Sequence, residues 1–329
     1  MPGSTPVIDV HAHLLGVDRE RHGCLLGERM RRRISTWATL RTMGARLSDP
    51  PADVDRRVVD HLRANLDASP SVARVVLLPL DGVYGEDGRL DERRTSLLVP
   101  NEYVHEVAAS HPKLVAAFSV NPYRADALAE LDRCAARGAV LVKWLPASMG
   151  FDPADPRCAP FYARLRELRM PLLSHIGTEM AVATVSKACG EQARLHAALD
   201  AGVTVIFPHA GGLRLFGDAA DWRGLVEEMR RFPDLWLDES ALLMFHRRPR
   251  LMCLLKTPEV HSRVLHGSDY PLPAQPLAFL DRIGFRRARA IRSIPGSFER
   301  DIALKRALGV PESILTRAGE VLRLPTRAG

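Results

Sequence analysis

Eight short apolar runs recur along this chain, and segments with helical periodicity separate them. The runs lie near residues 7–13, 72–80, 114–121, 139–145, 171–177, 203–209, 235–239 and 264–269. Between the first two runs, Val54, Val58, Leu62 and Leu66 repeat every four residues, as in an amphipathic helix. Strands that alternate eight times with helices predict an α/β protein, a (β/α)₈ TIM barrel. A doubly wound open sheet is the alternative.

The size of the chain fits one domain. Its 329 residues match a single barrel, and 46% hydrophobic residues can form a large core. We therefore expect one domain over residues 1–329. Residues 276–329 are rich in arginine and read as helices, which we expect to support the barrel from outside.

An unusually long segment, residues 14–53, follows the first run before its helix begins. Within it, five apolar residues recur at helical spacing and predict a helix packed across the barrel mouth, namely Met30, Ile34, Trp37, Leu40 and Met43. This lid-like insertion either covers the core alone or helps to bind an acidic or aromatic substrate.

Residue types that bind metals stand at or just after the ends of these runs. His11 and His13 share the first run, and they point to the same side because side chains in a strand alternate faces. His175, His209 and Asp269 follow three later runs. Each of these residues alone could be structural, as a hydrogen-bonded histidine or a turn aspartate. Because strand ends meet around one cavity in a barrel, the set together favours a functional site.

Lysine is rare in this chain, since 41 of the 46 basic residues are arginine. Lys143, followed by Trp144, nevertheless ends the fourth run and so belongs to the same rim. A lysine at that position suggests a chemical role for Lys143.

Composition excludes several other classes of protein. The net charge of +7 is spread along the chain with one short basic cluster, which argues against nucleic-acid binding. The five cysteines form no C-x-x-C pair, which argues against a disulfide framework and a thiolate zinc site. Because no stretch is long and apolar enough to span a membrane and no signal peptide is evident, we expect a cytoplasmic location.

Four segments carry a resemblance to a known family. They are Asp9-Val10-His11-Ala12-His13, His175-Ile176-Gly177, His209-Ala210-Gly211-Gly212 and Gly267-Ser268-Asp269-Tyr270-Pro271. In this order, over residues 7 to about 271, they resemble the amidohydrolase superfamily of metal-dependent TIM-barrel enzymes. The chain is most similar to the amidohydrolase 2 branch, which contains hydrolases and non-oxidative decarboxylases.

The resemblance implies a role for each of these residues. His11, His13, His175 and Asp269 would bind a divalent ion, usually zinc, which suits neutral imidazoles and a carboxylate. His209 would bind a second ion or hydrogen-bond water and substrate, and Asp269 would also act as the catalytic base.

The role of the strand-four lysine stays open. In binuclear relatives a lysine at the place of Lys143 is carboxylated and bridges two ions; otherwise it faces the substrate or an acid such as Glu179. We expect one ion and an uncarboxylated lysine, so Lys143, Glu179 and Trp144 are predicted to contact the substrate.

These observations predict an enzyme, namely a zinc-dependent hydrolase of an ester, lactone or amide of a small carboxylic or aromatic acid. A non-oxidative decarboxylase of an aromatic or related acid is the alternative, because it uses the same ligands. A metal-free binding module is a third possibility, against which the complete ligand set argues. The expected partner is a small molecule, not nucleic acid or a membrane, and a homo-oligomer is left open.

Overall fold

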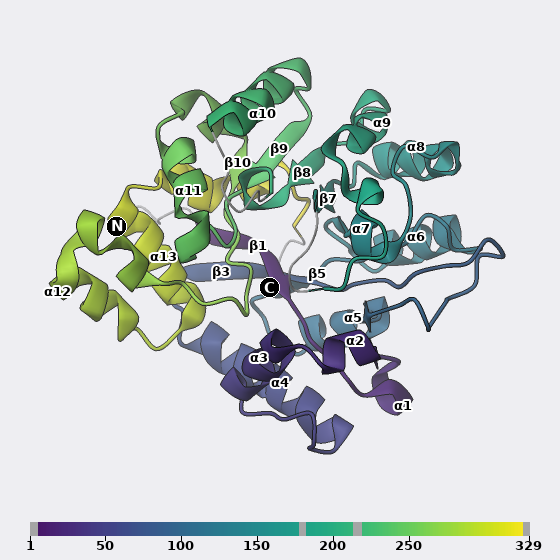
Figure 1. Ribbon diagram of the computed structural model, residues 1–329, viewed down its shortest axis with the longest axis horizontal. Coiled ribbons are helices and arrows are strands. Elements are labelled where there is room, and N and C mark those ends of the chain that lie inside the picture. The colour runs from purple at the N-terminus through teal and green to yellow at the C-terminus, as the bar shows by residue number, and fades with distance from the viewer. Residues whose placement is uncertain (1–5, 178–181, 213–218, 325–329) are drawn as a thin grey trace.

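The structure is a computed structural model that describes residues 6–177, 182–212 and 219–324. All eight predicted runs contain a strand, although most strands are shorter than the runs. The strands are β1 (Val7–His13), β3 (Val72–Leu78), β5 (Leu114–Ala116), β6 (Val142–Trp144), β7 (Leu172–Ser174), β8 (Val205–Phe207), β9 (Leu235–Asp238) and β10 (Val264–Leu265). Figure 1 shows them at the centre of the molecule with the helices around them.

The strands are parallel and follow chain order around a barrel. They pair as β1-β3-β5 and as β6-β7-β8-β9-β10. Single parallel bridges join the two groups, from Phe118 to Val142 on one side and from Ala12 to Tyr270 on the other. The predicted (β/α)₈ TIM barrel is therefore confirmed, with regular pairing interrupted at these two seams.

Helices cover the outside of the barrel. In α4, Val54, Val58, Leu62 and Leu66 are all buried, as their spacing predicts. The outer helices are α4 (Pro51–Asp67), α5 (Asn101–Ala109), α6 (Ala127–Ala136), α8 (Ala159–Leu168), α9 (His196–Asp200), α10 (Ala219–Arg231) and α11 (Arg248–Leu255). A short helix, α7 (Pro146–Met149), follows β6.

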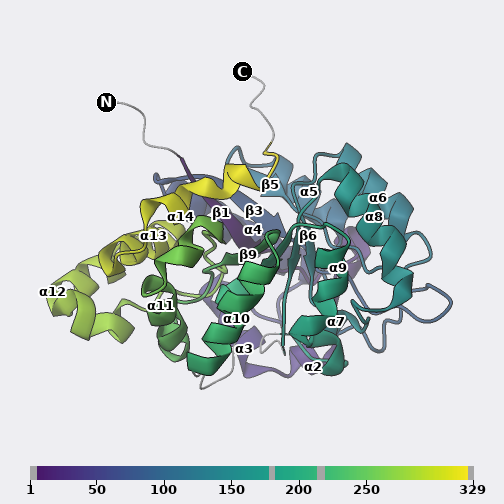
Figure 2. The ribbon, with the colours of Figure 1, turned by 90° about the horizontal axis from the view of Figure 1, so that it is seen from above.

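The insertion after β1 lies at the end of the barrel where the strands terminate. It contains α1 (Arg19–His22), α2 (Glu28–Arg31) and α3 (Ile34–Thr42), and its strand β2 (Leu25–Leu26) pairs with β4 (Leu97–Leu98). Figure 2 shows α2, α3 and α7 at one end of the molecule and α14 (Glu312–Thr316) at the other.

The predicted apolar face of the insertion is only partly correct. Met30, Leu40 and Met43 are buried, but Ile34 and Trp37 are 87% and 62% exposed. The chain breaks between α2 and α3 at the extended Arg33, so the spacing does not continue around one helix.

The C-terminal part packs on the barrel, as predicted. It comprises α12 (Leu280–Arg292), α13 (Ser297–Leu308), α14 and the 3₁₀ turn η8 (Arg317–Glu320). Ala318 and Leu322 pack with the barrel interior, where they join Ile8, Val10 and Leu265 in one apolar cluster. The end of the barrel opposite the insertion is thereby closed.

A buried ionic cluster ties α13 to the barrel. The Lys305 ammonium lies 2.7 Å from Glu239 Oε2 and 2.5 Å from Asp301 Oδ1, and it donates to the Gly267 carbonyl. The other carboxylate oxygen of Glu239 faces Nδ1 of His266 at 2.8 Å. All four side chains are buried, so each charge depends on the others for compensation.

None of the helices in the described ranges has the length and hydrophobicity needed to cross a membrane.

Candidate metal centre

Three potential ligand atoms meet where β1 ends. Nε2 of His11 and Nε2 of His13 are 3.1 Å apart, and Asp269 Oδ1 lies 3.6 Å and 3.3 Å from them. Two ligands about 2.0–2.1 Å from one tetrahedral zinc ion are about 3.3 Å from each other. The spacing and the chemistry of this donor set therefore fit a single divalent ion.

Local backbone contacts hold the two ligand-bearing segments together. The Asp269 N–H donates to the His11 carbonyl at 2.8 Å, and Asp269 has a left-handed φ of 60°. Oδ1 of Asp9 accepts the N–H groups of both His11 and Ser268, at 2.9 and 3.0 Å. Asp9 thus holds the segment after β10 against β1 by hydrogen bonds, and these bonds fix the distance between the ligands.

His11 is oriented by a carboxylate from β9. Its Nδ1 lies 2.8 Å from Asp238 Oδ2, so the proton of the neutral ring belongs on Nδ1 and the lone pair on Nε2 faces the other ligands. Burial and the neighbouring Lys143 lower the pKa of His11 to about 4. The ring is therefore neutral at physiological pH, as metal binding requires.

Asp269 is ionised in this environment. Burial raises its pKa, but His11 and His13 outweigh that effect and hold the pKa well below its usual range. The site therefore combines the imidazole nitrogens of His11 and His13 with one carboxylate.

The other predicted residues surround this group. Lys143, His175 and His209 line the same cavity, and Nζ of Lys143 lies 3.2 Å from Nε2 of His11. The rings of His175 and His209 are 5.3 Å apart, centre to centre. The ligand atoms of His11, His13 and Asp269 all lie within 4.8 Å of one another, and His175 lies outside this group.

His209 is held by Ser240 and Asp238. Its Nδ1 faces the Ser240 carbonyl at 3.1 Å, so Nδ1 carries the proton and Nε2 is left as an acceptor. Its backbone N–H donates to Asp238 Oδ1 at 3.0 Å. Burial, with a contribution from Arg247, lowers the pKa of His209 well below its usual value, so this ring is also neutral.

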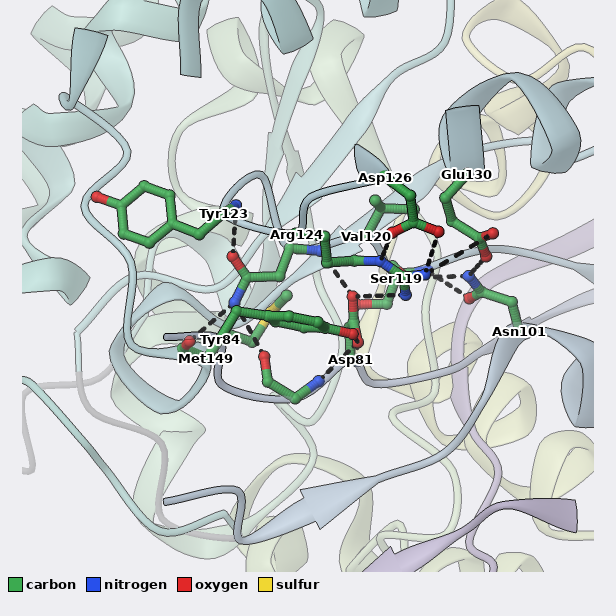
Figure 3. Close-up of polar contacts among 12 residues, drawn as sticks. Asp81, Tyr84, Asn101, Ser119, Val120, Tyr123, Arg124, Asp126, Glu130 and Met149 are labelled. Atoms are coloured by element: carbon green, nitrogen blue, oxygen red, sulfur yellow. Dashed lines mark hydrogen bonds and ion pairs between the residues drawn. The ribbon is translucent and has the colours of Figure 1, made fainter. Parts of the chain in front are cut away.

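A polar network fixes the rim beside Lys143 (Figure 3). The Ser119 hydroxyl donates to the Lys143 carbonyl at 2.8 Å, and the Ser119 N–H donates to Asn101 Oδ1 at 2.9 Å. The Asn121 N–H donates to the buried Asp81 at 2.8 Å, and Arg124 lies 3.4 Å from the same carboxylate. The ends of β3, β5 and β6 are therefore locked together, which places the backbone of Lys143 rigidly.

One predicted substrate contact, Trp144, is wrong. Trp144 is buried outside the cavity, where its indole N–H donates to the Val120 carbonyl and its ring packs on Phe151 and Phe161. Strand alternation explains this correction, because Lys143 faces the barrel mouth and the next side chain must face the helices. Glu179 lies outside the described residues.

Sequence reasoning missed Asp238 and Ser240. Asp238 is the last residue of β9 and lies inside the run predicted at 235–239. An acidic residue at a strand end was therefore the sequence feature that could have identified it. The Ser240 hydroxyl lies 3.1 Å from Nδ1 of His11 and 2.8 Å from Nδ1 of His209. Asp238 and Ser240, two residues apart, thus position the rings of both His11 and His209.

We expect Asp238→Asn to weaken metal binding by about 10- to 100-fold, because the amide cannot supply the charge that holds the His11 proton on Nδ1. Competition of the purified protein with a chromogenic zinc chelator measures the change. Asp234→Asn is the control, since Asp234 is an exposed carboxylate just before the same strand. Equal affinity in the Asp238 variant and the parent would contradict the orienting role.

Comparisons with known proteins agree with the fold. The amidohydrolase family model matches residues 8–290. No protein of curated function matches the sequence. Among solved structures, a protein from Pseudomonas putida assigned as a 2-pyrone-4,6-dicarboxylic acid hydrolase is similar, with 16% identity and a TM-score of 0.55 over 97% of this chain and 98% of its own.

Two decarboxylases have a similar fold. The 5-carboxyvanillate decarboxylase from Sphingomonas paucimobilis has 14% identity and a TM-score of 0.53, and the match covers 95% of this chain and 99% of that one. The enzyme of the same name from Novosphingobium aromaticivorans, crystallised with manganese, has 13% identity and a TM-score of 0.52, covering 91% and 94%. At these identities the likeness establishes the barrel and not the reaction.

Proposed function

This chain belongs to the amidohydrolase family, and we propose that it is a hydrolase that uses one divalent ion to cleave an ester, lactone or amide of a small acid. The observation that carries this proposal is the ionised Asp269 carboxylate beside the Nε2 atoms of His11 and His13. Water held at such a group has a proton acceptor within reach. Zinc is the proposed ion, because the donors are two imidazoles and one carboxylate.

Each residue has a distinct role in this proposal. A divalent ion in this position supplies a Lewis acid and lowers the pKa of water to about 7. Asp269 takes the proton from the attacking water and returns it to the leaving group. His209, neutral with Nε2 as an acceptor, orients water or substrate, and His175 completes the donor set.

The test of this function starts from protein stripped of metal and reloaded with zinc or manganese. We expect one ion per chain, and acid release from members of a panel of small esters, lactones and amides that stops when the metal is removed. A protein that takes up neither ion would overturn the metal-dependent proposal. A loaded protein without acid release from any member would overturn hydrolysis.

Decarboxylation is the second candidate, and the position of Lys143 in the cavity favours it. An ammonium group there can pair with the carboxylate of a substrate acid. The same loaded protein should then release CO₂ from aromatic acids and leave esters intact. That result would replace the hydrolase proposal.

We propose that Lys143 is uncarboxylated and that the site holds one ion. Lys143→Met is then expected to keep one ion per chain and to bind carboxylate products about 10- to 100-fold more weakly. Elemental analysis and calorimetry measure the two effects, and the exposed Lys187 gives the control variant Lys187→Met. A CO₂ adduct on Lys143 in mass spectra, or loss of an ion from the variant, would show a bridging carbamate instead.

A further inference from the structure

The ring of His11 lies between two opposite charges. Its Nδ1 donates to Asp238 Oδ2 at 2.8 Å, and on the other side Nζ of Lys143 lies 3.2 Å from its Nε2. The exposed fractions of Asp238, His11 and Lys143 are 0%, 0% and 1%. Water therefore screens neither contact, and both charges act on the ring at close range.

The contact between Lys143 and His11 uses the same nitrogen atom that a metal ion would use. Because the proton of the His11 ring is on Nδ1, the ring has a single lone pair, on Nε2. That lone pair can accept a hydrogen bond from the Lys143 ammonium or bind a metal ion, but it cannot do both. An ion held by His11 therefore breaks the hydrogen bond from Lys143.

The charge of Lys143 also opposes an ion at this position. Burial and, after it, the ammonium of Lys143 lower the pKa of His11 to about 4. The second of these causes is a repulsion between Lys143 and positive charge on the ring. A divalent ion at Nε2 brings more positive charge to the same atom than a proton does, so the repulsion acts on the ion as well.

We propose that Lys143 competes with the metal ion for His11 and thereby sets how tightly the ion is held. Asp238 and Lys143 then act in opposite directions on one ligand, because Asp238 supports the lone pair that Lys143 occupies. The fraction of protein that carries an ion therefore responds to a higher range of free metal concentration than it would without Lys143. This inference rests on the proposed function, in particular on one ion and an uncarboxylated Lys143.

The zinc affinities of the parent and of Lys143→Met test this competition without turnover. We expect the variant to bind zinc about 10- to 100-fold more tightly, because the ion no longer breaks a hydrogen bond from a charged group. Competition with a chromogenic chelator measures both affinities. Lys256→Met, at an exposed lysine, is the control and should bind zinc within about twofold of the parent. Equal or weaker zinc binding by Lys143→Met would overturn the inference.

Two further measurements exclude an effect of the methionine itself. Lys143→Leu, whose side chain has no sulfur to bind zinc, should also bind zinc more tightly than the parent. In a crystal structure of the zinc-loaded parent, Nζ of Lys143 should lie beyond hydrogen-bond distance of Nε2 of His11. Zinc bound without His11 would overturn the competition. A parent that takes up no zinc would overturn the metal-dependent function as well, whereas one ion per chain with the same affinity in all variants would remove only the role of Lys143.

Discussion

Asp269→Asn is expected to lower kcat by about 10²- to 10⁴-fold while most of the metal stays bound, because the amide cannot accept the proton of the attacking water. Asparagine should keep the local structure, since it tolerates the left-handed φ of 60° that Asp269 adopts. The three histidines His11, His13 and His175 remain as donors in the proposed site. Turnover of the best substrate from the ester, lactone and amide panel, normalised to metal content, is the measurement.

The matched control for this variant is Asp301→Asn, which alters a buried carboxylate outside the metal centre. It should change stability and leave kcat per folded, metal-loaded chain close to that of the parent. Near-parental turnover of Asp269→Asn would exclude this carboxylate as the base. If Asp269→Asn lost metal and turnover in equal proportion, Asp269 would act only as a metal ligand and not as the base.

Lys305→Met is expected to lower the free energy of unfolding by about 3–5 kcal/mol, because it leaves Glu239 and Asp301 buried without their cation. Urea unfolding followed by circular dichroism measures the loss. The control is Lys256→Met at an exposed lysine, which should stay within about 0.5 kcal/mol of the parent. A Lys305 variant as stable as that control would show that the cluster is dispensable.

The pH dependence of this loss has a definite sign. Burial raises the pKa of Glu239 to about 7, with Lys305 opposing the shift, and burial also raises the pKa of Asp301. A carboxyl with a raised pKa in the folded state contributes stability below its unfolded pKa and loses it as the pH rises through the folded value. Without Lys305 both pKa values rise further. The variant should therefore lose more stability at pH 8 than at pH 5.

The sequence was most informative where one physical rule decides the outcome. Strand alternation puts His11 and His13 on one face, and the barrel brings Asp269 to them although Asp269 and His13 are 256 positions apart along the chain. The same rule, applied to Lys143, would have excluded Trp144 from the cavity.

Other parts of the site depend on contacts that a single sequence does not reveal. Asp238 and His11 are 227 positions apart, and an aspartate at a strand end fits a turn as well as a histidine partner. The spacing of Ile34 and Trp37 predicted a buried face, but both side chains are exposed on α3, the helix that begins after the extended Arg33. Tertiary pairing and backbone breaks of this kind are set by the whole fold.

The closure of the barrel interior by Ala318 and Leu322 has a consequence for folding. These residues share one apolar cluster with Ile8 and Val10 of β1, although Val10 and Ala318 are 308 positions apart along the chain. Contacts of such long sequence separation form slowly, and apolar surface stays exposed until they do. Refolding is therefore expected to pass through a state in which the strands are paired and the end of the barrel opposite the insertion is still open.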